Sequence, residues 1–368
     1  MDPVKILKRA WAILWSYRAL WVFGLILALA TASSTGNGSN NGMRYEQGRN
    51  DPLPSSQTIQ EAFREAGQEI QRFFREGIPD ANISGEVLTA FIWLMVGFLV
   101  LLLVTGIIMA IARYVSEVAV IRMVDEYEAS GTKRTVREGF RIGWSNAAWR
   151  LFLINLIISL PVILLMLVLI GAGLGIYFSV SSGNGNITAL STVTIIGFVF
   201  LMIFVVVIVS IVLRLLRNFF WRISVLEDAG VSDSLRRGFE LVREQWKNVG
   251  LMWLVMIGLG IVWAIASILL FIITLPLLIV TAAIAALIVA APFLLLAGLF
   301  GLFLTGPLPW VAAGIFMLPL FFTLAFSPWL LVGSWQAVYT STVWTLTYRE
   351  IRALPAPANE PIVQPATG

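Results

Sequence analysis

Long apolar runs alternate with short charged segments along the chain. A helix that crosses a bilayer needs about 20 apolar residues, so these runs predict transmembrane helices. The final run has room for two or four crossings, because Pro276, Pro292 and residues 306–309 interrupt it. The apolar runs cover residues 19–32, 87–112, 151–178, 189–213 and 248–348.

The charged segment from Ser232 to Trp246 has the periodicity of an amphipathic helix. Leu235, Phe239 and Val242 recur at steps of three and four and share one face. Arginine, glutamate and lysine side chains fill the other face. Such a helix is typical of a membrane interface, with its apolar face towards the lipid.

This segment is one copy of a repeat. Residues 128–140 align with residues 227–239 without a gap. A fainter copy places Leu7 to Trp11 over Leu235 to Phe239, so that Ala10 matches a glycine of the other two copies. The identical pairs are Glu128 with Glu227, Gly131 with Gly230, Arg137 with Arg236, Gly139 with Gly238, and Phe140 with Phe239.

The repeated residues predict where helices end and begin. Gly131 and Gly230 suit the left-handed position that follows the last turn of a helix. Thr135 suits the N-cap of the next helix, with Glu138 at capping-box spacing. In the other copy Ser232 or Ser234 is expected to fill that N-cap position.

Gly139 and Gly238 then fall inside the amphipathic helices. Glycine at such a position costs about 1 kcal/mol relative to alanine. The faint first copy has Ala10 there, which is also small. We therefore expect a neighbouring helix to approach closely at these positions.

The predicted fold is an all-α, polytopic transmembrane helix bundle. Three helical hairpins, at about 1–113, 135–217 and 234–349, each follow an amphipathic interfacial helix. They form a single transmembrane domain over residues 1–352. The polar loop 33–86 carries a further amphipathic helix on the outer side, and residues 353–368 form a disordered tail. Six or eight crossings fit the pattern, with six and a re-entrant piece favoured.

Charge and composition orient this bundle. Hydrophobic residues make up 58% of the chain and charged residues only 12%. Most Lys and Arg residues lie in the termini and in segments 113–150 and 214–249, whereas loop 33–86 is acidic. The positive-inside rule then places both termini in the cytoplasm and the protein in the plasma membrane. Residues 1–32 also resemble a cleavable signal peptide, and an uncleaved first span is the preferred alternative.

The residue types limit the chemistry. The chain has no Cys and no His, so thiolate catalysis, a histidine base and the commonest metal ligands are absent. No phosphate-binding loop, dinucleotide fingerprint or serine-nucleophile motif occurs. The sequence predicts no catalytic residue, no cofactor and no metal, and hence no enzyme. Asn155 and Gln336 lie in predicted spans, where a hydrogen bond to a neighbouring helix is preferred over a substrate site.

Basic residues of the amphipathic helices are candidates for contact with lipid head groups. Acidic residues lie between them, so nucleic-acid binding is not expected. Membrane lipids are the expected partners, together with a membrane protein or an enzyme. The candidate residues are Lys8, Arg9, Arg137, Arg236, Arg237 and Arg243.

Two segments of the chain also resemble a known family. They are Leu235 to Arg243 with Trp246, and Trp344 to Glu350. They are similar to the multi-pass membrane domain associated with some bacterial glycerophosphodiester phosphodiesterases, and to related stand-alone membrane proteins. Such enzymes have a separate catalytic domain with acidic and histidine residues. This chain has no histidine, so the resemblance implies no phosphodiesterase activity.

Two functions fit this pattern. The first is a non-enzymatic scaffold or accessory protein that acts on lipids or on a partner enzyme. The alternative is a carrier or flippase-like transporter of a lipid or an apolar solute. An intramembrane enzyme is the weakest of the hypotheses.

Overall fold

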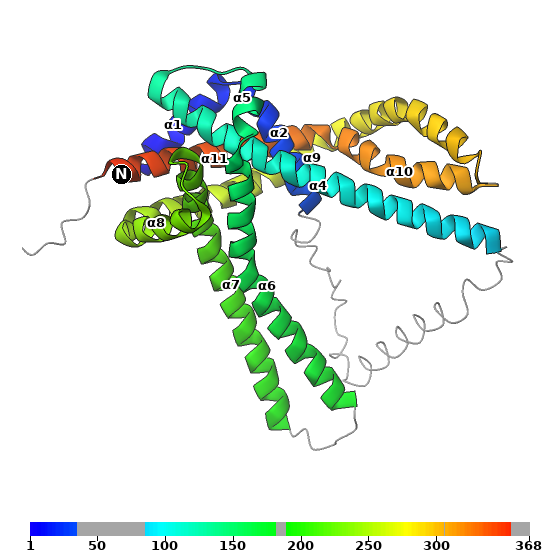
Figure 1. Ribbon diagram of the computed structural model, residues 1–368, viewed down its shortest axis with the longest axis horizontal. Helices are drawn as coiled ribbons and strands as arrows, with labels where there is room; N and C mark the ends of the chain where they lie inside the picture. Colours follow the sequence, from blue (N-terminus) through cyan, green and yellow to red (C-terminus); the bar gives the residue numbers. More distant parts are fainter. Residues whose placement is uncertain (35–84, 182–188, 305, 355–368) are drawn as a thin grey trace, which may run out of the picture. The chain divides into compact units, whose positions relative to one another are not determined.

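The computed structural model describes residues 1–34, 85–181, 189–304 and 306–354, which form helices joined by turns (Figure 1). No strand occurs in these ranges, so the predicted all-α class is confirmed. The amphipathic helix expected in loop 33–86 and the tail beyond residue 354 lie outside the described residues. The helices are α1 (Pro3–Ser16), α2 (Ala19–Ser34), α4 (Gly85–Ser130), α5 (Val136–Gly143), α6 (Asn146–Ser181), α7 (Ala189–Leu226), α8 (Val231–Glu244), α9 (Trp246–Phe300), α10 (Leu308–Ala325) and α11 (Ser327–Ala353).

Five stretches of helix in the described residues are long and apolar enough to cross a membrane. A sixth arises if α1 and α2, which meet at a bend of 102°, count as one broken span. These helices are compatible with a multi-pass membrane protein. The five stretches are Met95–Ser130, Asn146–Gly171, Gly197–Leu226, Trp246–Phe300 and Leu308–Ala325.

The last apolar run folds differently from the expectation. Helix α9 is continuous over 55 residues and passes through Pro276 and Pro292, where the sequence pattern predicted interruptions. The turn comes later, between α9 and α10. Gly306 has a left-handed backbone there, with φ of +67°. The described part of this run therefore contains no additional hairpin between residues 246 and 300.

The chain divides into two compact units. The first contains Met1–Thr31, Gly106–Ala285 and Phe322–Gly368, and the second contains Ala32–Thr105 and Ala286–Phe321. In the second unit, Phe316 of α10 packs against Phe98 of α4 and Phe300 of α9, with ring centroids 5.6 and 5.5 Å apart. Aromatic packing therefore holds the described helices of that unit together.

The core of the first unit lies at one end of its helices, and this end is rich in charged residues. Helices α4 and α7 do not stop where their apolar runs stop, at residues 112 and 213, but continue to Ser130 and Leu226. Most residues of these continuations are at least partly buried, together with part of α11 and the inner faces of α1 and α5. The buried core includes Ile13, Leu20, Phe23, Val118, Ile121, Met123, Phe219, Ile223, Val338 and Val343.

The turn before α5 has the predicted geometry. Gly131 has φ of +71°, and its N–H donates to the Tyr127 carbonyl at 2.8 Å, which closes α4. The Thr135 hydroxyl accepts from the Glu138 N–H at 3.4 Å, and the Glu138 carboxylate accepts from the Thr135 N–H at 2.8 Å. The capping box predicted from the sequence is confirmed.

The equivalent turn before α8 contradicts the prediction. Gly230 has φ of −63° and is itself the N-cap residue, without a side-chain cap. The left-handed residue is Asp228, with φ of +51°, because aspartate tolerates this region better than most residues. Ser232 and Ser234 lie inside the helix. A shared glycine in the two copies therefore does not imply the same backbone conformation.

Candidate functional site

The two repeated glycines mark close helix contacts. A Cβ atom added at Gly139 would lie 2.5 Å from the Phe23 ring and 2.6 Å from the Met123 sulfur. A Cβ atom added at Gly238 would lie against the Phe220 ring. Ala10, at the matching position of α1, is fully buried. The close approach expected at these positions is present in the structure.

Each amphipathic helix packs on the final part of a long helix. Helix α5 lies on α4 through Gly139, and α8 lies on α7 through Gly238. Helix α1 packs on α11, where the Tyr339 hydroxyl donates to the Leu7 carbonyl at 3.4 Å. The three amphipathic helices thus surround the charged ends of α4, α7 and α11.

The repeated glutamates accept ion pairs in this region. Glu128 is paired with Arg9 at 3.0 Å. Glu227 is paired with Arg237 at 3.3 Å and with Arg352 at 2.9 Å. The carboxylates are mostly shielded, with 23% and 19% of their side chains exposed. The repeat therefore conserves an acid that anchors neighbouring helices.

The residues predicted to contact lipid heads fall into two groups. Arg9 and Arg237 are engaged by these glutamates, and Arg236 is paired with Glu240 one turn away at 3.1 Å. The other three are exposed and form no ion pair within the described part of the chain. These are Lys8, Arg137 and Arg243. Phe140 packs on Phe23 at 4.9 Å, whereas Phe239 is 54% exposed.

A buried polar cluster joins α4, α7 and α11. The Arg222 guanidinium, only 1% exposed, lies 3.7 Å from the Glu117 carboxylate. It donates to the Ser341 carbonyl at 3.0 Å and to the Asn218 carbonyl at 3.0 Å. The Ser341 hydroxyl donates to the same Glu117 oxygen at 2.8 Å. The two terminal nitrogens of Arg222 and the Glu117 carboxylate thus have partners on three helices, as burial of charge requires, whereas Arg222 Nε has no partner among the described residues.

Sequence reasoning missed this cluster because it treated residues 113–150 and 214–249 as charged segments outside the spans. One signal was available. No glycine or proline occurs between Ala112 and Gly131, or between Leu213 and Gly230. Without a helix breaker, each helix continues and carries its charged residues into the core.

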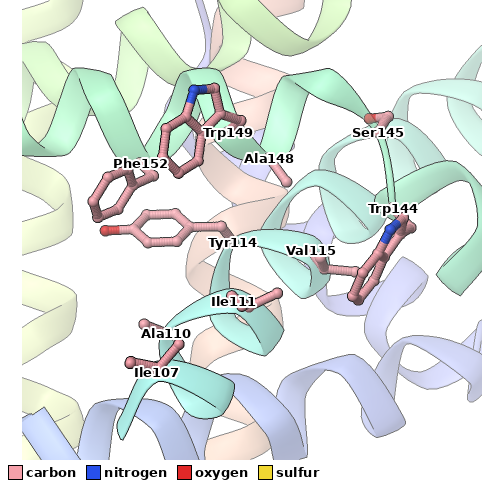
Figure 2. A pocket seen from close by; sticks show the side chains of 10 residues that line it. All are labelled: Ile107, Ala110, Ile111, Tyr114, Val115, Trp144, Ser145, Ala148, Trp149 and Phe152. Carbon is pink, nitrogen blue, oxygen red and sulfur yellow. The ribbon is translucent and has the colours of Figure 1, made fainter. Parts of the chain in front are cut away.

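A cavity of about 450 Å³ lies beside this cluster, between α4 and the turn from α5 to α6 (Figure 2). Its lining is almost entirely apolar and aromatic. Tyr114 packs edge-on against Phe152 at 5.8 Å, and Trp149 stacks on Phe152 at 5.0 Å. The lining residues are Ile107, Ala110, Ile111, Tyr114, Val115, Trp144, Ser145, Ala148, Trp149 and Phe152.

Asn155, one turn beyond Phe152 on α6, links this cavity to α7. Its side-chain oxygen accepts from the Arg217 guanidinium at 3.1 Å. The guanidinium also lies over the Trp221 ring, 4.9 Å from its centroid. The prediction that Asn155 binds a neighbouring helix is confirmed. Gln336, the other amide predicted in a span, is exposed.

A second cavity, of about 400 Å³, lies where α4, α7 and α11 end. Asp125 is paired with Arg349, and the Tyr348 hydroxyl donates to Glu227. Burial and the Glu227 carboxylate raise the pKa of Tyr348 well above its ordinary value, so the phenol stays protonated and donates. Both signs of charge line this cavity. Among the residues described, no three acidic side chains are grouped so that they could hold a metal ion.

Comparisons with known proteins give one match. Neither a curated protein nor a solved structure matches the chain. The resemblance to the membrane domain associated with glycerophosphodiester phosphodiesterases therefore stays a prediction. A model of a family of unknown function, DUF7544, matches residues 7–345. This match covers most of the chain, which therefore belongs to this family.

Proposed function

We propose that this protein is a non-enzymatic membrane scaffold that organises lipids or a partner enzyme at the cytoplasmic face of the plasma membrane. One observation carries the proposal. The tightly packed part of the first unit consists of amphipathic helices and charged helix ends, whereas the apolar stretches of α6 and α7 are barely buried. Only 6% and 11% of their most apolar windows are covered by protein. Such surfaces suit contact with lipid or with another membrane protein.

The fold that supports this function is a three-fold repeat of interfacial helix, outgoing span and returning span. Helices α1, α5 and α8 start the three copies, and α4, α7 and α11 end them. The glycine contacts of α5 and α8 and the packing of α1 on α11 support this organisation. In such a scaffold the helical hairpins pack together at their charged ends, and their apolar sides are available for contact with lipid or with another membrane protein.

The orientation follows from charge. Arginine and lysine residues concentrate in the packed end of the first unit, which the positive-inside rule assigns to the cytoplasm. Single-cysteine labelling tests this, because the chain has no cysteine of its own. A Ser232→Cys variant in α8 should react with a membrane-impermeant maleimide only after the cells are opened. Labelling in intact cells would contradict the orientation.

A carrier or flippase-like function is the second candidate. The apolar cavity at Tyr114 and the neighbouring buried ion pair of Glu117 and Arg222 favour it. A transporter of lipid needs both an apolar surface and a shielded polar region. The two features are adjacent in the first unit.

Liposomes that contain the full-length protein and a fluorescent phospholipid distinguish the two functions. A membrane-impermeant reductant bleaches only the outer leaflet. A scaffold leaves the inner-leaflet fluorescence protected, as in protein-free liposomes. Progressive loss of that protected fraction would contradict the scaffold and support the carrier. Hydrolysis of a glycerophosphodiester by the pure protein would contradict both.

A further inference from the structure

Positive charge is in excess where α4 and α7 leave their apolar stretches. Arg113 lies on α4, and Arg214 and Arg217 are three residues apart on one face of α7. No ion pair involves any of the three within the described ranges. The Glu117 carboxylate, one turn beyond Arg113 on α4, is already held by Arg222 and Ser341. These three arginines, which we call the arginine cluster, have no ion-pair partner among the residues that the structure describes.

Arg217 is the most constrained member of the cluster. Its guanidinium is fixed by the Asn155 oxygen and by the Trp221 ring. Its Nε atom is buried without a hydrogen-bond partner. Arg113 and Arg214 lie close enough to act on its charge. A partly desolvated cation beside two like charges is costly unless an anion is present.

The arginine cluster adjoins the apolar cavity. The Tyr114 ring lines the cavity and packs edge-on against the Trp221 ring, with centroids 6.4 Å apart. The Arg217 guanidinium lies over that same Trp221 ring. Figure 2 shows the Tyr114 ring extending beneath Phe152. Trp144 and Trp149, at the rim, are 71% and 63% exposed. Tryptophan is enriched at the depth of the lipid head groups. The cavity beside these tryptophans therefore suits the part of an acyl chain that lies next to the glycerol.

We propose that the arginine cluster binds the phosphate of an anionic phospholipid of the cytoplasmic leaflet, with an acyl chain in the cavity lined by Tyr114. Arginine recognises phosphate through several parallel hydrogen bonds. A lipid with net negative charge is favoured, because a choline or ethanolamine group would bring a further cation beside three arginines. The proposal deepens the proposed function, since it names the lipid class that the scaffold holds.

Native mass spectrometry of the full-length protein tests the phosphate contact. Delipidated protein is titrated with equal amounts of phosphatidylglycerol and phosphatidylcholine of the same acyl chains. The wild type is expected to retain phosphatidylglycerol preferentially. Arg217→Gln should weaken that retention about tenfold, as expected for loss of a charge-assisted contact. Arg18→Gln, which removes one exposed charge from the turn between α1 and α2, is the matched control and should bind like the wild type.

A second variant, Arg214→Gln, keeps the test valid if the Arg217 variant misfolds. Arg214 is exposed and its guanidinium makes no hydrogen bond among the described residues, so its loss should not disturb the fold. It should also lower retention of phosphatidylglycerol. Equal retention of the two lipids by the wild type, or unchanged selectivity in both arginine variants, would overturn the proposal. Displacement of the bound lipid by millimolar inorganic phosphate alone would also overturn it, because the cavity would then contribute nothing.

Photo-crosslinking tests the acyl-chain contact. Phosphatidylglycerol with a diazirine near the glycerol end of one acyl chain is expected to label peptides that contain residues 107–115 and 144–152. Ala148→Trp should fill the cavity and remove these adducts, whereas Ala264→Trp, at an exposed position of α9 that does not line the cavity, should keep them. Adducts that persist in Ala148→Trp would contradict the site. If the liposomes show lipid movement while the protein still prefers phosphatidylglycerol, only the proposed scaffold function is overturned. If the protein shows no such preference and the liposomes show no lipid movement, only this binding site is overturned.

Discussion

In α7 the apolar part is exposed and the charged part is buried, which is the reverse of the pattern in a soluble protein. Near the start of the helix, Phe200 is 73% exposed and Leu201 is 57% exposed. Near its end, the Arg222 side chain is only 1% exposed and is surrounded by α4 and α11. Apolar exposure is stable only in an apolar solvent, so the first part fits a bilayer. The second part is the folded core, and it is held by polar contacts as well as by apolar packing.

The specific packing of the first unit therefore resides in the charged segments. The apolar stretches have lipid as an equivalent partner, so their association with each other gains little from burial. The charged ends have no such alternative, because a buried charge needs defined partners.

Removal of Arg222 should cause the largest loss. Arg222→Ala leaves the Glu117 carboxylate buried without its partner, which costs about 3–5 kcal/mol in free energy of unfolding. Unfolding in detergent, followed by circular dichroism against denaturant, measures the change. Leu201→Ala, in the exposed part of the same helix, is the control and should change stability by less than about 0.5 kcal/mol. Similar losses in the two variants would remove the distinction between the two parts of α7.

A second variant isolates the role of charge. Arg222→Met with Glu117→Met replaces the buried ion pair by apolar side chains of similar length. Such replacements are often neutral or stabilising. The double variant should therefore recover most of the stability that Arg222→Ala loses. A double variant as unstable as the single one would show that the hydrogen bonds to Ser341 and Asn218, rather than the charges, hold the three helices.

The repeated glycine of α8 should give an intermediate effect. Gly238→Ala places a methyl group against the Phe220 ring, and such overpacking costs about 1–3 kcal/mol. Gly171→Ala in α6 has no described atom within 4 Å of the added Cβ. There the higher helix propensity of alanine should add up to about 1 kcal/mol. The same denaturation experiment compares them, and a stabilising Gly238→Ala would contradict the close contact of α8 with α7.

The two turns before α5 and α8 give a smaller effect. Thr135→Ala removes the capping box of α5 and should cost about 1 kcal/mol. Ser232→Ala should be nearly neutral, because Ser232 is not the N-cap of α8. Amide hydrogen exchange in the first turn of each helix measures the difference. Equal deprotection in the two variants would indicate that Ser232 caps α8 in solution.

The acid dependence of α5 is the smallest expected effect. Hydrogen bonds from the Thr135 N–H and hydroxyl lower the pKa of Glu138, with the nearby Arg134 and Arg141 adding to the shift. A depressed folded pKa means that this contribution is complete above the unfolded pKa and is lost as pH falls through the folded pKa. Exchange protection at the start of α5 should therefore fall in acid. Glu138→Gln should abolish that dependence, and a persisting acid dependence would point to another group.

The sequence predicted those features that depend on short-range rules. Long apolar helices, amphipathic helices, the Gly131 turn and the Thr135 capping box follow from periodicity and local hydrogen bonding. The described residues contain the helices, the turn and the capping box, and five of the helices are long and apolar enough to cross a membrane. The need for a small residue at Gly139 and Gly238 could also be predicted from the sequence. Glycine inside a helix is unfavourable, so its presence there indicates that a neighbouring group leaves no room for a larger side chain. Their partners Phe23 and Phe220 could not be named, since each contact depends on tertiary packing.

The buried cluster was out of reach for a different reason. Glu117 and Arg222 are more than one hundred residues apart, and so are Arg222 and Ser341. Charge near a span end ordinarily indicates a solvated or snorkelling side chain. Only the continuation of α4 and α7 without a breaker could have suggested burial. The contrast between Gly131 and Gly230 has a similar origin, because Asp228 takes the left-handed position in the second turn.

Electron paramagnetic resonance of single spin labels tests the central contrast most directly, because the cysteine-free chain accepts one label at a time. Labels at Leu167 of α6 and Phe200 of α7, in liposomes, should collide readily with oxygen, which partitions into the bilayer. Labels at Ile121 and Ile223 should collide rarely with oxygen and with a water-soluble nickel complex, as expected for a packed core. Low oxygen collision at both Leu167 and Phe200 would contradict exposure of the apolar stretches to lipid, because they would then be buried against protein.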